Sequence, residues 1–115
     1  MDLVEREIHC FKDNDGKEPA KGFLLELKKK KRFLELAKIN TRIKRAGKGN
    51  FGDHRFLGGN FLELKIDFGS GYRIYCGIDG DKFIIIVQGG TKQSQEVDIE
   101  VAKKNWQSYL KSKNK

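Results

Sequence analysis

The hydrophobic residues in the second half of the chain fall into three runs that predict three β-strands. The runs cover residues 61–68, 72–78 and 83–87. In the first two, hydrophobic and polar residues alternate, which is the period of a strand with one face in the core and one in solvent. The third is continuously hydrophobic, as expected for a strand that is covered on both faces. Glycine-containing turns at 69–71 and 79–81 join the runs, so the sequence predicts an antiparallel three-stranded meander.

The first half of the chain predicts one strand followed by two helices. Residues 3–11 mix hydrophobic and charged positions and predict the strand. Hydrophobic residues then recur every three or four positions, which is helical spacing, and the phase slips across the run KKKKR at 28–32. We therefore expect helices at about 19–28 and 31–46, with Pro19 at the first helical position, packed as a hairpin on the sheet.

A glycine-rich link and a last helix complete the expected order of elements. Residues 47–59, GKGNFGDHRFLGG, predict a connection without regular structure. Ser94 can cap the last helix, and the acidic residues that follow suit its first turns. Its expected buried stripe consists of Ile99, Ala102, Trp106, Tyr109 and Leu110.

These elements predict a single α+β domain that spans residues 1–115. Its expected architecture is a small twisted, mainly antiparallel sheet with an N-terminal strand, a helical hairpin packed on one face, the meander and a C-terminal helix.

The net charge and the cysteine content indicate which binding partners and which cellular compartment to expect. The chain has 24 Lys and Arg against 16 Asp and Glu, a net charge of +8 and a pI near 9.5, which favours a polyanionic partner. Nucleic acid is the first candidate, before an acidic protein or a membrane surface. The N-terminus is too charged for a signal peptide, and no hydrophobic run approaches the roughly 20 residues of a membrane span, so we expect a cytoplasmic protein without membrane contact. Cys10 and Cys76 lie in strand patterns and are expected to be buried free thiols.

The ordinary enzyme motifs are absent from the sequence. There is no Ser-His-Asp set, Cys/His metal spacing, Walker loop or GxGxxG fingerprint, so no metal or cofactor is expected and any catalysis must use cations and carboxylates. Lys65 and Arg73 have matching outward phase on neighbouring strands, and Lys92 follows the third strand. Such cations could hold a phosphate. The alternative is that they are three unrelated surface cations.

Three segments carry a family resemblance that covers nearly the whole chain. They are GNFGDHRFLGG, ELKIDFGSGYRIYCGIDGDK and QGGTKQSQEVDIEVAKKNW. In this order they resemble the RelE/ParE superfamily of toxin-antitoxin toxins, and most closely its HigB-like branch, the addiction module killer proteins. The resemblance implies a small twisted sheet with a helical hairpin against one face. It also implies cleavage of mRNA on the ribosome without a metal, which many members carry out.

The resemblance assigns roles to individual residues. Lys65 matches the strand lysine of RelE-type nucleases, Arg73 matches their phosphate-binding arginine, and Lys92 lies where they have a second arginine. Lysine there keeps the charge but cannot offer a bidentate fork to a phosphate. Asp98 falls at the position of their catalytic tyrosine and Glu63 at that of another lysine, so the chain departs from the RelE pattern at both places.

We therefore expect a ribosome-dependent, metal-independent mRNA endoribonuclease, the toxin of a type II toxin-antitoxin pair. A ribose 2′-hydroxyl would attack its own 3′-phosphate, with Arg73 and Lys92 on the phosphoryl oxygens. Lys65 would take the hydroxyl proton, with Asp98 or Glu96 as alternatives. The further cations expected to contact RNA or phosphate are Arg55, Lys48 and Lys82.

Two other functions fit the same fold and stay open at this point. One is a ParE-like inhibitor of DNA gyrase, and the other is a degenerate member that only binds its antitoxin. The expected partners are a cognate antitoxin with a helix-turn-helix fold, mRNA and the ribosome. The free toxin is expected to be a monomer.

Overall fold

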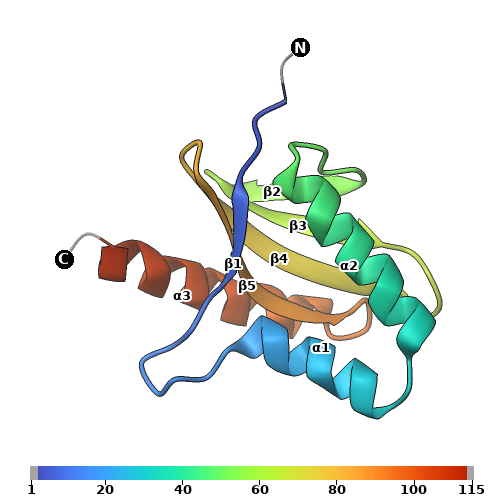
Figure 1. Ribbon diagram of the computed structural model, residues 1–115. Helices are drawn as coiled ribbons and strands as arrows, with labels where there is room; N and C mark the ends of the chain where they lie inside the picture. Colours follow the sequence, from blue (N-terminus) through green and yellow to red (C-terminus); the bar gives the residue numbers. More distant parts are fainter. Residues whose placement is uncertain (1–2, 114–115) are drawn as a thin grey trace.

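The computed structural model describes residues 3–113, which form three helices and a five-stranded mixed sheet (Figure 1). In chain order the elements are β1 (Glu7–Cys10), α1 (Pro19–Lys29), α2 (Phe33–Gly47), β2 (His54–Gly58), β3 (Phe61–Ile66), β4 (Tyr72–Asp79), β5 (Phe83–Thr91) and α3 (Gln95–Lys113). The strand order is β1-β5-β4-β3-β2. Strand β1 is parallel to β5, and the other pairs are antiparallel. Helices α1 and α2 lie on one face of the sheet and α3 on the other.

The helical hairpin is confirmed, with bounds within two residues of those expected. Pro19 stands in the first turn of α1, where its missing N–H leaves no hydrogen bond unmade. The helix ends at Lys29, and Lys31 takes a φ of 59°, which redirects the chain into α2. This break coincides with the phase slip in the hydrophobic pattern.

The expected connection at 47–59 is wrong in its second half, because residues 54–58 form strand β2. This strand pairs with β3 and extends the predicted three-stranded meander to four strands. Gly58 and Gly59 both have positive φ, which lets the chain reverse between β2 and β3 within two residues. The run His54 to Leu57 is too short for its alternation to stand out among the glycines.

Each face of the sheet carries its own hydrophobic core. The core under α1 and α2 is centred on Ile39, Leu62, Leu64, Ile74, Cys76, Ile84 and Ile86. The core under α3 contains Phe11, Phe61, Tyr75, Ile85, Val87, Ala102 and Trp106. Strand β5 therefore contributes to both cores, as its continuous hydrophobic run predicts. The predicted stripe of α3 is confirmed, since all five of its residues are buried in the second core or packed against it.

The expected solvent-exposed, charged face of β3 is wrong, because α3 covers that face. Glu63 has no exposed surface and Arg73 only 5%. A glycine in β4 allows the helix to approach closely, since a Cβ on Gly77 would lie 2.3 Å from the Trp106 ring. The indole therefore rests directly on the strand.

The two cysteines differ in exposure. Cys76 is buried in β4, as expected, whereas Cys10 is exposed because β1 is an edge strand. Of the helices within residues 3–113, none has the length and hydrophobicity to span a membrane.

Candidate functional site

Polar side chains line the part of the sheet that lies under the first turns of α3. Strand register aligns them in two rows. One row runs from Arg55 through Glu63 and Tyr75 to Gln88, and the other pairs Lys65 with Arg73. These six side chains form a polar platform. Because side chains alternate along a strand, all six belong to the same face of the sheet.

Arg73 faces the same side as Lys65, as predicted, but it is buried instead of exposed. Its guanidinium Nη1 donates hydrogen bonds to the Asp67 carboxylate at 3.0 Å and to the Tyr72 carbonyl at 2.9 Å. Its Nε is buried without a hydrogen-bond partner among residues 3–113. The charge is therefore held inside the platform, while Asp67 remains largely exposed.

Glu63 is a fully buried carboxylate at the centre of the platform. Its Oε2 accepts a hydrogen bond from Gln95 Nε2 of α3 at 2.7 Å. Its Oε1 lies 3.4 Å from Arg55 Nη2, an ion pair whose geometry is not that of a hydrogen bond. Because a buried charge requires compensation, Arg55 and Gln95 together fix Glu63 and tie α3 to the sheet.

Tyr75 lies directly opposite Glu63 and is also fully buried. Within residues 3–113 its hydroxyl has no hydrogen-bond partner of acceptable geometry. Burial raises the pKa of Tyr75 well above its ordinary value, and the charges of Glu63 and Asp98 raise it further. The phenol is therefore neutral at physiological pH.

Asp98 lies in the first turn of α3, where it contacts the platform residue Gln88. Its carboxylate accepts hydrogen bonds from the Ser94 hydroxyl and from Gln88 Nε2, the latter at 3.4 Å. A Cβ on Gly90 would overlap the Asp98 carboxylate, so the close approach of helix and strand requires glycine. Ser94 precedes the helix as predicted, but its hydroxyl bonds the Asp98 side chain and the Thr91 carbonyl. Asp98 is thus engaged in holding the start of the helix.

At the end of the sheet where Arg73 lies, Lys65 and Lys92 face solvent. Lys65 is half-buried and Lys92 exposed. Lys92 follows β5, and its backbone N–H donates to the Gly71 carbonyl at 3.1 Å, which places it at the end of the sheet where β3 ends and β4 begins. Among residues 3–113 neither ammonium forms an ion pair. Lys65, Arg73 and Lys92 therefore share one end of the sheet.

The three further cations expected to bind phosphate do not gather there. Arg55 belongs to the platform. Lys82 lies in the turn between β4 and β5, at the opposite end of the sheet from Lys65. Lys48 follows the last turn of α2 and is exposed on the other side of the molecule from α3. Lys82 and Lys48 therefore lie away from the platform, and their expected contacts with RNA or phosphate stay a prediction.

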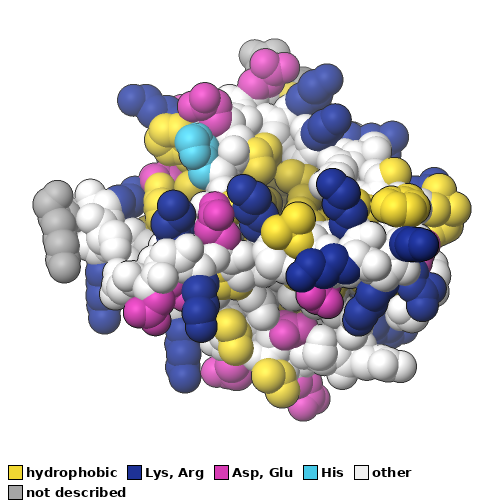
Figure 2. Space-filling view, turned by 60° about the horizontal axis from the view of Figure 1, so that its bottom comes forward, with side chains coloured by type: hydrophobic (Ala, Val, Ile, Leu, Met, Phe, Trp, Pro, Cys, Tyr) yellow, Lys and Arg dark blue, Asp and Glu magenta, His cyan; other side chains and the backbone are white. Residues whose placement is uncertain are grey.

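On the face of the molecule that Figure 2 shows, the positive charge is spread out. In the view with the lower side of Figure 1 turned forward, Lys and Arg side chains are scattered, with Asp, Glu and hydrophobic groups among them (Figure 2). The cations of the platform therefore differ from the other surface cations by their position on the sheet, and not by a higher local density of positive charge.

The sequence pattern did not predict one group of side chains, the aromatic residues Phe51, His54 and Phe56. Their rings lie in mutual edge-to-face contact. The sequence feature that could have indicated this group is the alternation of histidine and phenylalanine with arginine in the segment 47–59. The glycines of the same segment instead favour a connection without regular structure.

Comparison with known proteins identifies a relative of the chain but does not assign a function. No protein-family model matches the chain. An uncharacterized protein of Haemophilus influenzae is 44% identical over 77 residues, which cover 67% of this chain and 78% of that protein. The chain belongs to the same family as this Haemophilus influenzae protein.

Proposed function

We propose that the chain is the toxin of a type II toxin-antitoxin pair, a RelE/ParE superfamily member of the HigB-like branch. The order of the three motif segments supports this proposal. The element order also supports it, because a strand, a helical hairpin, an antiparallel meander and a final helix are the parts that the resemblance implies. In this proposal the toxin acts in the cytoplasm and is neutralised by a small helix-turn-helix antitoxin.

The proposed activity is cleavage of mRNA on the ribosome without a metal. The observation that carries it is the pairing of Lys65 with Arg73 on adjacent strands, with Lys92 at the same end of the sheet. Clustered cations can offset the negative charge that develops on a phosphoryl group under attack. A 2′-hydroxyl would attack the adjacent phosphorus to form a 2′,3′-cyclic phosphate, and the bond to the 5′-oxygen would break, with that oxygen taking a proton from solvent water.

Because Arg73 is buried, its proposed role differs from the roles of Lys65 and Lys92. Since Lys65 and Lys92 reach solvent and Arg73 does not, Lys92 would contact the phosphoryl oxygens and Lys65 the attacking 2′-hydroxyl, whose proton it would take. Arg73, which is buried beside Lys65, would raise the local positive potential.

Mapping of transcript ends after induced expression tests the proposal. The parent chain should arrest growth and produce new 5′-hydroxyl ends within translated messages. Lys65→Ala and Lys92→Ala should each reduce cleavage about a hundredfold, the usual effect of removing one group that stabilises transition-state charge. Lys111→Ala, an exposed lysine near the far end of α3, is the matched control and should cleave like the parent.

Two outcomes would refute the nuclease. One is a soluble, folded parent chain that leaves growth and transcripts unchanged. The other is growth arrest with intact mRNA and gyrase-linked DNA breaks, which would instead indicate a ParE-like inhibitor.

A further inference from the structure

The aromatic residues Phe51, His54 and Phe56 form a ring cluster on the free edge of the sheet. Ring centroids are 5.5 Å apart for Phe51 and His54, 5.6 Å for His54 and Phe56, and 6.5 Å for Phe51 and Phe56. Register places His54 opposite Leu64 and Phe56 opposite Leu62, so both rings are on the face that carries α2. Between them, Arg55 points to the other face, where it pairs with Glu63.

The cluster is anchored on one side and open on the other. Phe51 packs against the core under α1 and α2. The His54 ring is oriented by a 2.7 Å hydrogen bond between Nδ1 and the Gly52 carbonyl, which leaves Nε2 for a ligand. Phe56 is 48% exposed. An aromatic ring that is held in place and half open to solvent is a surface on which another flat group can stack.

The backbone beneath the cluster is rigidly held. Arg42 of α2 donates hydrogen bonds to the carbonyls of Phe51 at 2.8 Å, Asp53 at 2.8 Å and Lys65 at 2.6 Å. One side chain therefore fixes the loop before β2 to strand β3. This support positions the rings in advance, which lowers the entropic cost of binding.

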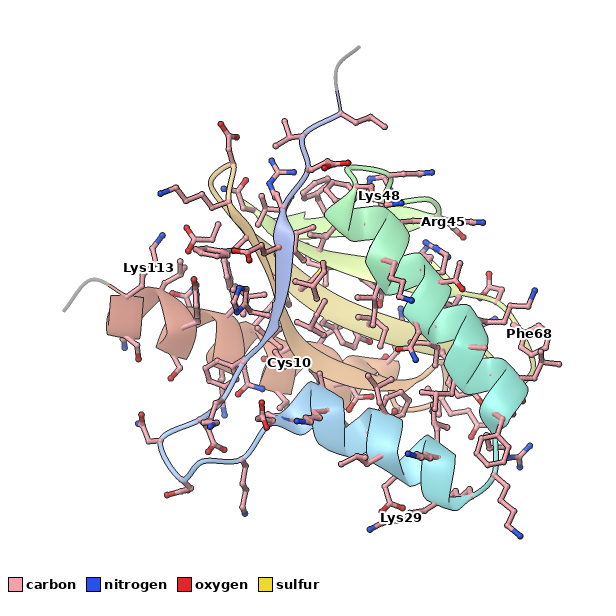
Figure 3. All side chains as sticks on the ribbon, in the orientation of Figure 1. Cys10, Lys29, Arg45, Lys48, Phe68 and Lys113 are labelled. Atoms are coloured by element: carbon pink, nitrogen blue, oxygen red, sulfur yellow. The ribbon has the colours of Figure 1, made fainter. Side chains whose placement is uncertain are left out.

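Cations lie near the rings. Arg45 and Lys48 are exposed at the end of α2 (Figure 3). The Arg45 carbonyl accepts a hydrogen bond from the N–H of Asn50, in the loop that leads to Phe51, whereas Lys48 follows Gly47, which contacts the N-terminal segment. Arg55 is half exposed on β2 itself. Exposed aromatic rings with Lys and Arg around them are the combination that binds single-stranded nucleic acids, because the rings stack on bases while the cations follow the phosphates.

We propose that the ring cluster is a stacking site for unpaired bases of single-stranded RNA. The strand would cross the free edge of β2, with a base on Phe56 and phosphates beside Arg55, and would continue toward Lys65 on the other face. Identification of the polymer as RNA rests on the proposed function. A protein partner is the less favoured occupant, because the exposed apolar surface is a few rings on a domain of net charge +8.

Fluorescence anisotropy with a labelled, unstructured 2′-O-methyl oligoribonucleotide tests the site. This probe cannot be cut, because its attacking oxygen is blocked. Phe56→Leu should weaken binding by about five- to a hundredfold, the range for losing one base stack, whereas Phe56→Trp should bind at least as well as the parent. Phe33→Leu is the matched control and should bind like the parent, since Phe33 stacks with no other ring among residues 3–113 and is 58% exposed beside basic residues.

Leucine keeps the hydrophobic bulk at position 56, so thermal unfolding should show both Phe56 variants folded, and a change in affinity then reports stacking. The stacking site is overturned if the parent fails to bind the probe. It is also overturned if Phe56→Leu binds within twofold of the parent, if Phe33→Leu loses as much affinity, or if Phe56→Leu changes only self-association or protein binding.

Binding of the blocked probe does not depend on cleavage, so the two proposals can fail separately. A chain that leaves transcripts intact but binds the probe through Phe56 refutes the nuclease alone. A chain that cleaves transcripts but binds the probe without regard to Phe56 refutes the stacking site alone.

Discussion

Replacing Arg73 separates the packing role of its side chain from the role of its charge. The side chain is 5% exposed, and it lies opposite Gly90, on the face of the sheet that carries α3. Arg73→Ala removes two buried methylene groups, at about 0.8 kcal/mol each, and a hydrogen bond to a buried carbonyl, at about 1 kcal/mol. The lost ion pair adds little, because Asp67 is 63% exposed. We expect the free energy of unfolding to fall by about 3 kcal/mol in total.

Arg73→Met is the matched variant, because it retains an unbranched stem of similar length and removes the charge. Its free energy of unfolding should fall by only about 1 kcal/mol, the value of the hydrogen bond. For a domain of this size each kcal/mol corresponds to about 4 °C, so thermal unfolding should occur about 12 °C lower for Arg73→Ala and about 4 °C lower for Arg73→Met. Both variants should lose transcript cleavage if the positive charge behind Lys65 is required.

The result that would refute this reasoning is equal stability of the two variants and the parent. Arg73 would then be a surface residue, as its sequence pattern suggested, and α3 would not cover it. A stable Arg73→Met protein that cleaves transcripts like the parent would instead show that the charge is dispensable for catalysis.

Three further predictions follow from the packing of α3 and from the buried groups. Gly77→Ala should lower the unfolding temperature by several degrees, because its Cβ would overlap the Trp106 ring and overpacking costs about 1 to 3 kcal/mol. The pKa of Asp79 lies below its ordinary value of 3.8, because its carboxylate accepts hydrogen bonds from a lysine and a tyrosine near the end of α3. Its stabilisation is therefore complete above that value and lost as the pH falls through the lower folded-state pKa. Asp79→Asn should remove this part of the acid unfolding curve. In the native chain a thiol reagent should label Cys10 but not Cys76, since burial raises the pKa of Cys76 to about 12, and both should react in denaturant.

Hydrophobic periodicity was sufficient to predict most of the fold. Helical spacing identified α1 and α2, and the phase slip across 28–32 includes the break between them at 30–32. Alternation identified β3 and β4, and continuous hydrophobicity correctly indicated that β5 is covered on both faces. Strand β2 was missed because five residues between glycines carry too few alternations to be distinguished from a loop.

The alternation of hydrophobic and polar residues in β3 and β4 could not show that the platform is buried. A strand with charged residues at every second position predicts one exposed face, and this inference holds only if nothing packs there. Whether α3 covers the face depends on contacts between residues far apart in sequence, such as the hydrogen bond from Gln95 to Glu63 across 32 positions. Register, in contrast, was predictable, and Lys65 does lie opposite Arg73.

The burial of Glu63 and Arg73 determines which residues should be substituted to test function. Glu63 and Arg73 each stabilise the position of α3 or of the sheet, so the loss of either affects the fold and any chemistry together. Lys65 and Lys92 reach solvent at the same end of the sheet and form no ion pairs among residues 3–113. Because surface substitutions usually change stability by no more than about 0.5 kcal/mol, the effect of removing these two lysines can be attributed to binding or catalysis. The lysines, and not the arginine that the family resemblance emphasises, are therefore the decisive positions.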